Sequence, residues 1–424
     1  MFHFAYGDDG WMAAEGVPLP GIAGAVGTPT YVYAQATLDR HLRVFDEAFS
    51  GHPHLICYAM KANSSQAILR LVADRGAGAD IVSGGELFRA MRAGVPPERI
   101  VFSGVGKTAH EMAEALRAGV LCLNVESEPE LSALARVAAE VGRRAPVSLR
   151  VNPDIDAQTH PYIATGLRES KFGIPIDDAP RLAARVAGDP NLELVGLDCH
   201  IGSQIVSLDP LLGALDSVIE LSDQLRALGH PVRHLDLGGG LGIPYDRETP
   251  PHPSELGRAV VERMRGRPES IVLEPGRVIV GNAGVLLTRV LYVKDAPARR
   301  FVVVDAAMND LMRPSLYDAH HDIWPVKRAE SDERSVVDVV GPVCESGDTF
   351  ARARPLPPVR AGDLVAIMSA GAYGYAMASN YNSRARACEV LVHGDRWAVV
   401  RERETNESLV AGESVPAWLE GAND

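Results

Sequence analysis

The stretch LICYAMKAN, residues 55–63, runs six apolar residues directly into a lysine and an asparagine. LICYAM has the length and the apolar, partly β-branched and aromatic composition of a buried parallel strand. Lys61 stands where that strand would end. A lysine held away from water loses stabilisation of its charge, so its pKa would fall and its amine could attack an aldehyde. The alternative is a lysine whose stem covers the strand end while its charge reaches water.

Similar apolar runs recur along the chain, separated by amphipathic helical patterns that end near glycine. The seven further runs are ADIVS (79–83), RIVFSG (99–104), LCLNVE (121–126), VSLRVN (147–152), LVGLDCHIGS (194–203), HLDLGGG (234–240) and SIVLEPG (270–276). Eight strands alternating with helices over about 250 residues predict an α/β fold of the (β/α)8 barrel type. A doubly wound open sheet is the alternative, but the GxGxxG turn that usually follows its first strand is missing.

The pattern changes after Arg277, where strand-like runs are separated by proline, glycine and charged turns with little helical periodicity. These runs are VLLTRVLYVKD (285–295), RRFVVVDAA (299–307), SVVDVVGPV (335–343), DLVAIMSA (363–370), RACEVLVHGD (386–395) and RWAVVRER (396–403). We therefore predict a barrel domain over 30–280, beginning with the strand TYVYA (30–34) and a helix capped by Thr37. Residues 1–29 and 281–424 are expected to form a second, mostly β domain.

Composition narrows the class of protein. The chain has 424 residues, 46% hydrophobic and 23% charged, with a net charge of −13. Such a charge argues against a nucleic-acid or anionic-membrane partner. The five cysteines lie far apart without a CxxC pair, which favours a reducing compartment and no zinc site or other metal. The N-terminus resembles no signal peptide and no run is long enough to span a bilayer, so we expect a cytoplasmic protein.

Unusual polar residues follow the predicted barrel strands, at the end where such barrels carry their chemistry. They are Lys61, Asp80, Ser83, His200, Ser203, the run Gly238–Gly240, Glu274 and Arg277. Glycines let the backbone approach an anion and point several N–H groups at it, and the loops after strands seven and eight commonly bind phosphate. A flexible turn is the alternative for the glycines, and a lone histidine such as His200 is more often structural.

Taken together, these residues describe a pyridoxal-phosphate site. The cofactor requires a lysine for its aldehyde, an anion-binding cup for its phosphate and a partner for its pyridine nitrogen. Glu274, as a carboxylate partner, would keep that nitrogen protonated and make the ring a strong electron acceptor.

Four motifs, YAMKAN (58–63), HIGSQ (200–204), LGGGLGIPY (237–245) and EPGR (274–277), resemble the fold-type III pyridoxal-phosphate-dependent decarboxylases, which have an alanine-racemase-like barrel and a β domain. Further segments resemble the members that convert meso-2,6-diaminopimelate to L-lysine and CO2, the last step of lysine biosynthesis. They are ADIVSGGEL (79–87), RVNPD and KFGI within 150–174, MNDLMRPSLYDAHH (308–321), VGPVCESGD (340–348) and SAGAYGYAMASNYNSR (369–384).

The resemblance implies a role for each matching residue. Lys61 would bind the cofactor covalently, His200 would stack on its ring and Glu274 would face its pyridine nitrogen. The phosphate would be held by Ser203, Gly238, Gly239, Gly240 and the backbone of Gly276 and Arg277.

The same resemblance implies the contacts of the amino-acid substrate. Arg277, Arg313 and Tyr317 would hold its distal carboxylate, because guanidinium groups bind carboxylates bidentately. Glu345 would meet the distal ammonium, and Tyr373 would touch cofactor and substrate. Cys344 would donate a proton from the neighbouring subunit of a homodimer with shared sites; a buried structural cysteine is the alternative.

Two other functions remain open at this point. A pyridoxal-phosphate-binding protein without turnover would typically lack the lysine or the proton donor, and both Lys61 and Cys344 are present. A related decarboxylase of ornithine, arginine or lysine, or of a carrier-bound amino acid, would have no use for Arg313 beside Tyr317. A racemase fits less well because the second domain, with PVCESGD, resembles the decarboxylases.

Overall fold

Eight parallel strands close into a barrel in the computed structural model, which describes residues 2–156 and 171–419. The strands are β5 (His54–Ala59), β6 (Gly78–Ile81), β7 (Ile100–Phe102), β8 (Cys122–Val125), β9 (Ala145–Asn152), β11 (Leu192–Asp198), β12 (His234–Asp236) and β13 (Ser270–Leu273). Each pairs with its neighbour in this order, and β13 pairs with β5 to close the ring. The short strand β10 (Ile174–Pro175) adds to the edge of β9. The predicted barrel is confirmed, strand for strand.

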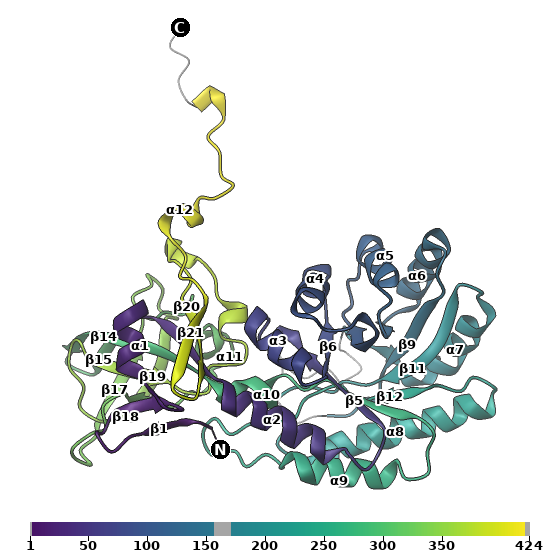
Figure 1. The fold of residues 1–424 in the computed structure, drawn as a ribbon, viewed down its shortest axis with the longest axis horizontal. Coiled ribbons are helices and arrows are strands. Elements are labelled where there is room, and N and C mark those ends of the chain that lie inside the picture. Colours follow the sequence, from purple (N-terminus) through teal and green to yellow (C-terminus); the bar gives the residue numbers. More distant parts are fainter. Residues whose placement is uncertain (1, 157–170, 420–424) are drawn as a thin grey trace.

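Helices follow the strands and cover the outside of the barrel (Figure 1). They are α3 (Gln66–Asp74), α4 (Gly84–Ala93), α5 (Ala109–Ala118), α6 (Glu128–Val141), α7 (Ala179–Gly188), α8 (Leu208–Ala227), α9 (Pro253–Arg263) and the short α10 (Arg277–Val280). The three helices α4, α5 and α6 each end at a glycine in the left-handed conformation, which a side chain would strain. One further helix, α2 (Gln35–Ala48), precedes the first barrel strand and contacts α9.

Thr37 does not cap α2, contrary to the sequence-based expectation. The helix begins at Gln35, and Thr37 is buried inside its first turn. The Thr37 hydroxyl instead accepts a hydrogen bond from the His3 backbone N–H at 3.0 Å. The local sequence alone did not show that the N-terminal segment would supply this partner.

The second domain is built on one large mixed sheet, seen beside the barrel in Figure 1. Its strands are β4 (Thr30–Ala34), β14 (Gly284–Asp295), β15 (Arg300–Val304), β16 (Ile323–Pro325), β17 (Ser335–Val340), β18 (Thr349–Leu356), β19 (Leu364–Ile367), β20 (Cys388–His393) and β21 (Arg396–Arg401). Strand β4 pairs with β14 and β20 and with no barrel strand among the described residues. We therefore move the domain boundary predicted at residue 30 to residue 35.

The N-terminal residues pack on this second sheet. Strands β1 (Phe4–Tyr6), β2 (Met12–Ala14) and β3 (Val17–Pro18) form a small antiparallel sheet, and helix α1 (Leu19–Val26) follows. Their buried side chains share a hydrophobic cluster with β4, β14 and β20. No helix within the described ranges is long and apolar enough to cross a membrane. Residues 157–170, in the middle of the 150–174 motif, lie outside the described residues.

Candidate active site

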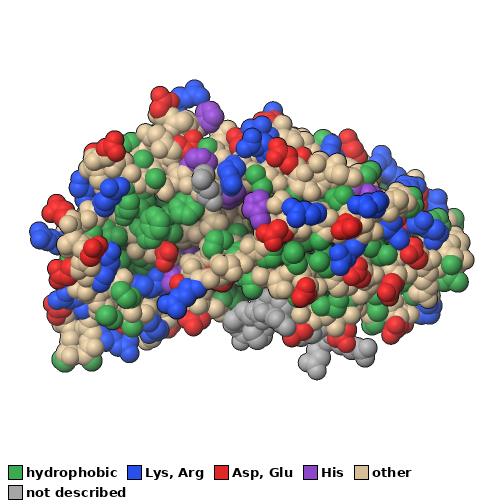
Figure 2. Space-filling model, turned by 90° about the horizontal axis from the view of Figure 1, so that it is seen from below, with side chains coloured by type: hydrophobic (Ala, Val, Ile, Leu, Met, Phe, Trp, Pro, Cys, Tyr) green, Lys and Arg blue, Asp and Glu red, His purple; other side chains and the backbone are tan. Residues whose placement is uncertain are grey.

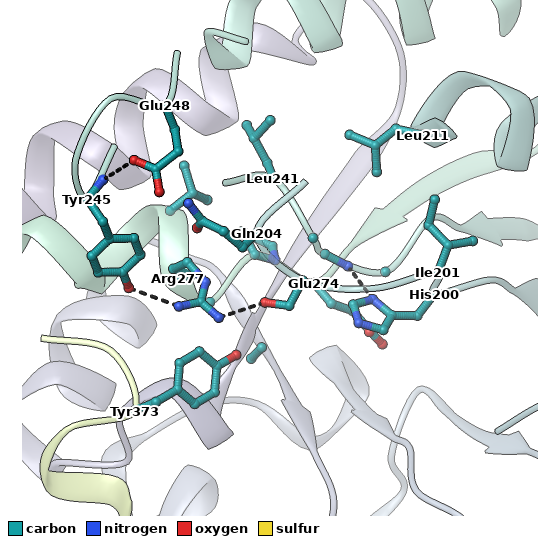
Figure 3. Close-up of a pocket in the computed structure, with 18 of the residues that line it drawn as sticks. His200, Ile201, Gln204, Leu211, Leu241, Tyr245, Glu248, Glu274, Arg277 and Tyr373 are labelled. Atoms are coloured by element: carbon teal, nitrogen blue, oxygen red, sulfur yellow. Dashed lines mark hydrogen bonds between the residues drawn. The ribbon is translucent and has the colours of Figure 1, made fainter. Parts of the chain in front are cut away.

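One cavity of about 630 Å³ opens at the carboxyl ends of the barrel strands. The barrel supplies most of its wall, from the segments after β5, β11, β12 and β13. The second domain contributes Arg313 and Tyr317 from α11 (Arg313–Tyr317), and Tyr373 from the segment after β19. The predicted barrel residues other than Asp80 and Ser83 line a single space together with these three side chains, and part of it is drawn in Figure 3. The hydroxyl of Ser83 instead caps helix α4.

Lys61 lies in the turn after β5, where its Nζ is 3.0 Å from Oδ2 of Asp80 on the neighbouring strand β6. Burial opposes the charge of Lys61, but the carboxylates of Asp80 and Glu274 outweigh burial and raise the pKa of the amine. The sequence-based expectation of a lowered pKa for Lys61 is therefore wrong for the protein without a bound cofactor. Asp80 holds the amine as an ammonium at the cavity wall and fixes its direction.

The glycine run Gly238–Gly240 is required by close packing. A Cβ on Gly239 would lie 2.3 Å from the carbonyl oxygen of Glu274, and one on Gly240 would lie 2.7 Å from the carbonyl oxygen of Gly202. Gly238 and Gly240 also have φ values of +60° and +109°, which favour glycine. Without side chains, the backbone of this run forms part of the cavity wall.

The backbone at this wall offers donors for an anion. Within the described residues, the N–H groups of Gly240, Gly276 and Arg277 donate to no acceptor, and all three residues line the cavity. The hydroxyl of Ser203 lies in the same part of the wall, 2.9 Å from Nη2 of Arg277. Converging N–H groups with a guanidinium beside them are the donor set that binds phosphate in proteins. The cavity therefore fits the phosphate of pyridoxal phosphate.

His200 follows β11, and its ring stands against the glycine run (Figure 3). The N–H of Gly239 donates to Nδ1 of His200 at 3.1 Å, so Nδ1 carries a lone pair. Burial, together with the charges of Lys61 and Arg150, lowers the pKa of His200 well below its usual range. His200 is therefore a neutral, flat ring with its hydrogen on Nε2, suited to stacking on an aromatic group.

Three carboxyl groups lie close together at one end of the cavity region. We name this group, which consists of Asp198, Asp236 and Glu274, the acidic end. Asp198 and Asp236 pair in register at the ends of β11 and β12, and Glu274 follows β13. Carboxylate oxygens of the three residues lie within 4.8 Å of one another. An acidic end of this kind suits a ring nitrogen that carries a proton; the spacing alone would also suit a cation.

Burial favours the protonated form of the acids at this end. Burial, followed by the charge of the neighbouring carboxylates, raises the pKa of Asp236 and Glu274 well above the usual range. Burial raises the pKa of Asp198 to about 7 although Arg150 lies 3.6 Å away. Oδ1 of Asp198 and Oδ2 of Asp236 are buried without a hydrogen-bond partner in the described structure.

Arg277 and Arg313 form the basic end of the cavity. Arg277 donates to the hydroxyls of Tyr245 and Ser203, each at 2.9 Å, while its Nε has no partner among the described residues. The guanidinium of Arg313 lies 4.5 Å from the centre of the Tyr245 ring and donates to His321 at 2.7 Å. Two adjacent buried guanidiniums form a strong site for a carboxylate.

Tyr373 contacts both Arg277 of the basic end and the turn that carries Lys61. Its N–H donates to the carbonyl of Ala62 at 2.8 Å, next to Lys61, and Arg277 lies 4.9 Å from the centre of its ring. The φ of Tyr373 is +55°, a strained value for a non-glycine residue. This contact fixes the second domain to the turn that carries Lys61.

Cys344 and Glu345 do not line this cavity. Both are exposed on the loop between β17 and β18. The buried carboxylate of Asp348 accepts hydrogen bonds from the N–H groups of Met308 and Val343, and the N–H of Cys344 donates to Asn382. The loop is thus held in place with the thiol facing away from the protein interior.

Sequence reasoning missed several residues that shape the site, including Asp198, Asp236, Arg150, Tyr245 and His321. A carboxylate inside an apolar run, as in LDC (197–199) and LDL (235–237), was an available signal, since such a group needs a partner when buried. Tyr245 and His321 stand within quoted motifs but carry no local signal of their own.

Comparison with known proteins identifies relatives of the whole chain. Residues 35–281 match the family described as pyridoxal-dependent decarboxylase, pyridoxal binding domain. The diaminopimelate decarboxylase of Pseudomonas aeruginosa is 54% identical over 415 residues, covering 98% of this chain and 99% of the relative. That of Vibrio cholerae is 51% identical, with 98% and 99% covered.

Solved structures agree with the sequence comparison. The diaminopimelate decarboxylase of Helicobacter pylori, complexed with L-lysine, has a TM-score of 0.90 at 44% identity, covering 93% of this chain and 98% of its own. That of M. jannaschii, also in complex with L-lysine, has a TM-score of 0.93 at 37% identity, with 99% and 100% covered.

Proposed function

This chain belongs to the pyridoxal-dependent decarboxylases and, within them, to the diaminopimelate decarboxylases, and on that premise we propose its reaction and the residues that perform it. The protein is a pyridoxal-phosphate-dependent carboxy-lyase that converts meso-2,6-diaminopimelate to L-lysine and CO2. The observation that carries this proposal is that a single cavity is lined by Lys61 and Glu274 and also by two buried guanidiniums, Arg277 and Arg313, which make no ion pair within the described residues.

The acidic end and the glycine wall would hold the cofactor. Lys61 would bind its aldehyde carbon, Glu274 its pyridine nitrogen, and the N–H groups of Gly240, Gly276 and Arg277 its phosphate. His200 would lie against the ring as a neutral, flat surface. When bound there, pyridoxal phosphate accepts the electron pair that the departing CO2 leaves behind.

The basic end would orient the substrate. Diaminopimelate has an amino-acid group at each end, so the end that does not react presents a carboxylate to Arg277 and Arg313. Tyr317 and Tyr373 line the same wall and would complete the contact. Fixing the distal end would orient the reacting carbon so that its bond to the carboxylate is the one that breaks, and would thereby select loss of CO2. Ornithine and arginine carry no distal carboxylate, and they would leave two buried guanidiniums unpaired.

A substrate panel tests this proposal. Release of CO2 is measured with meso-diaminopimelate, L-lysine, L-ornithine and L-arginine under identical conditions. Diaminopimelate should give the highest kcat/KM, because removal of the distal carboxylate leaves the basic end uncompensated. A higher kcat/KM with any of the other three amino acids would contradict the assignment.

The active enzyme is proposed to be a homodimer in which Cys344 and Glu345 complete the cavity of the partner. Both side chains are exposed outside the cavity of their own chain, yet the family resemblance gives them roles in catalysis. Exposed apolar side chains on the extended C-terminal segment (Figure 1) would also be covered by a second copy; they are Val410, Val415, Trp418 and Leu419. Figure 2 shows further hydrophobic side chains gathered on one face of the second domain. A two-fold dimer would bury the same surface twice.

In such a dimer Cys344 would return a proton to the carbon that lost CO2. A cysteine side chain positioned at the reacting carbon can act as such a proton donor. Glu345 would meet the distal ammonium of the substrate. Lys61→Ala and Cys344→Ala should each be nearly inactive alone.

Mixing these two variants tests the shared site. After subunit exchange, half the dimers are mixed and half their sites have both residues intact, so about one site in four should recover activity. Activity that stays at the level of the unmixed variants, despite demonstrated exchange, would rule out a site shared between subunits.

We also propose that the protein works in the cytoplasm. All five cysteines are free in the structure, and four of them are buried. Thiols that need no disulfide partner are typical of a reducing compartment.

A further inference from the structure

The basic end holds its guanidiniums with neutral partners. Arg277 and Arg313 are 7% and 6% exposed, and neither makes an ion pair with any acid among the described residues. Buried arginines are normally paired with carboxylates, because an uncompensated buried charge is unstable. Here the partners are the hydroxyls of Tyr245 and Ser203 for Arg277, and the imidazole of His321 for Arg313.

The hydrogen bonds of His321 determine its charge. The carbonyl of Met368 lies 2.8 Å from Nδ1 of His321, and a carbonyl can only accept, so Nδ1 carries the hydrogen. Nη1 of Arg313 lies 2.7 Å from Nε2, and a guanidinium can only donate, so Nε2 carries the lone pair. Burial, with Arg313 beside the ring, lowers the pKa of His321 to about 3. His321 is therefore neutral, with both nitrogens used.

The second domain fixes this imidazole in place. Strands β16 and β19 pair with Ile323 opposite Ile367, and the N–H of Met368 donates to the carbonyl of Asp322 at 2.8 Å. The ring of Tyr245 packs edge-on against His321, with centroids 5.3 Å apart. His321 itself is 0% exposed.

Two acids near His321 contact His320 and Arg354. Asp322 lies 3.0 Å from Nε2 of His320 and 3.7 Å from Arg354, and Asp246 lies 3.9 Å from Nδ1 of His320. Both carboxylates are half exposed. Neither carboxylate forms an ion pair with Arg313 in the described structure.

We propose that His321 is a positioning residue that fixes Arg313 through a neutral acceptor, so that the basic end keeps the charge of both arginines and selects ligands with a distal carboxylate. A carboxylate at this position would hold Arg313 equally well but would cancel one of the two charges that the ligand must meet. The inference rests on the proposed function and adds a determinant of specificity that touches neither cofactor nor substrate.

The experiment compares a matched pair of variants, His321→Gln and His321→Glu, in the cofactor-loaded enzyme. Both side chains place an oxygen near the position of Nε2, and they differ in charge. The probes are L-lysine, which keeps the distal carboxylate, and cadaverine, the same diamine chain without it. Calorimetry and inhibition constants give the affinity of each probe, and the readout is the ratio of the two affinities.

The neutral variant should keep the lysine-to-cadaverine ratio within about threefold of wild type. His321→Glu should weaken L-lysine by about tenfold or more and change cadaverine by less than about threefold, since one positive charge is cancelled. It should also raise KM for diaminopimelate more than it lowers kcat, because the distal contact is made in both the ground and transition states. Equal changes for both probes, or an unchanged affinity for lysine, would overturn the proposal.

His321→Leu keeps the proposal testable if His321→Glu does not fold. Loss of the acceptor should release Arg313 and lower the same ratio, and a wild-type ratio in His321→Leu would show that His321 positions nothing. The outcomes also separate the two proposals. Binding with the expected ratios but without CO2 release would break the proposed function alone, whereas turnover of diaminopimelate with unchanged ratios would break this inference alone.

Discussion

At the acidic end of the cavity, three carboxyl groups within 4.8 Å of one another respond to burial by retaining protons. At the basic end, two guanidiniums are equally buried, but an arginine cannot lose its proton in a protein. The acidic end can therefore neutralise itself, whereas the basic end depends on an anion that the described part of the chain does not supply. This difference supports the proposal that the acidic end holds the cofactor and the basic end a charged substrate.

The two ends also differ in how the fold assembles them. The acidic end comes entirely from neighbouring barrel strands, and the pairing of β11 with β12 brings Asp198 and Asp236 together. The basic end requires both domains, because Arg277 follows β13 and Arg313 comes from α11. Under the proposed function, substrate recognition is thus the property that depends on the contact between domains.

The largest expected effect is that of removing the amine between the two ends. Lys61→Ala should lower kcat by roughly 10⁴-fold or more, as is usual when a residue that bonds covalently is lost. It should also abolish the absorbance of a bound protonated imine. In wild type, borohydride reduction followed by peptide mapping should place the cofactor on Lys61.

The control for this prediction is Lys327→Ala. Lys327 is exposed, packs on the ring of Trp11 and does not line the cavity. This variant should keep both the absorbance and the label on Lys61. A label on any other lysine of the wild-type enzyme would contradict the role of Lys61.

The second prediction separates substrate binding from cofactor binding. Arg313→Ala should lower kcat/KM for diaminopimelate by roughly 30- to 5,000-fold, because the distal carboxylate loses a buried partner. This factor corresponds to a loss of about 2–5 kcal/mol of transition-state stabilisation. The absorbance of the bound cofactor should remain, since Arg313 lies at the basic end. Loss of that absorbance together with activity would show that the two ends are not independent.

Local sequence pattern was enough for the barrel and for the strand-end residues. Parallel strands of a closed barrel present their carboxyl ends at one rim, so the positions of Lys61, His200 and Glu274 followed from the order of strands. Strand β4 was misplaced for the same reason: TYVYA reads like a barrel strand, and only its pairing with β14 and β20 assigns it to the other sheet.

Features that depend on distant partners could not be read from the sequence. The pKa of Lys61 rises because Asp80 of another strand lies 3.0 Å away, whereas the lysine alone predicts a fall. The orientation of Arg313 depends on the pairing of β16 with β19, which joins segments about 40 residues apart in the chain. Only the family resemblance pointed to Arg313 beforehand.

The smallest expected effect concerns the protons of the acidic end, and it follows from the pKa of Asp198. In an unfolded chain this carboxyl has a pKa of about 3.9, whereas burial raises it to about 7 in the fold. Between these values the folded protein binds a proton that the unfolded chain has lost, so the stability of the fold falls as pH rises. One such proton corresponds to about 1.4 kcal/mol per pH unit at most. Asp198→Asn removes this titration.

Melting temperatures of the cofactor-free wild type and Asp198→Asn, measured from about pH 4 to pH 9, cover the window between the two pKa values and the range above it. The variant should gain stability relative to wild type as pH rises through that window, and the difference should level off above pH 7. Asn has nearly the same size and shape as Asp, so the packing at that position, where Arg150 lies 3.6 Å from the wild-type carboxylate, changes little. A difference that is constant with pH would mean that Arg150 keeps Asp198 ionised. The acidic end would then carry buried charge as the basic end does, and the contrast between the two ends would disappear.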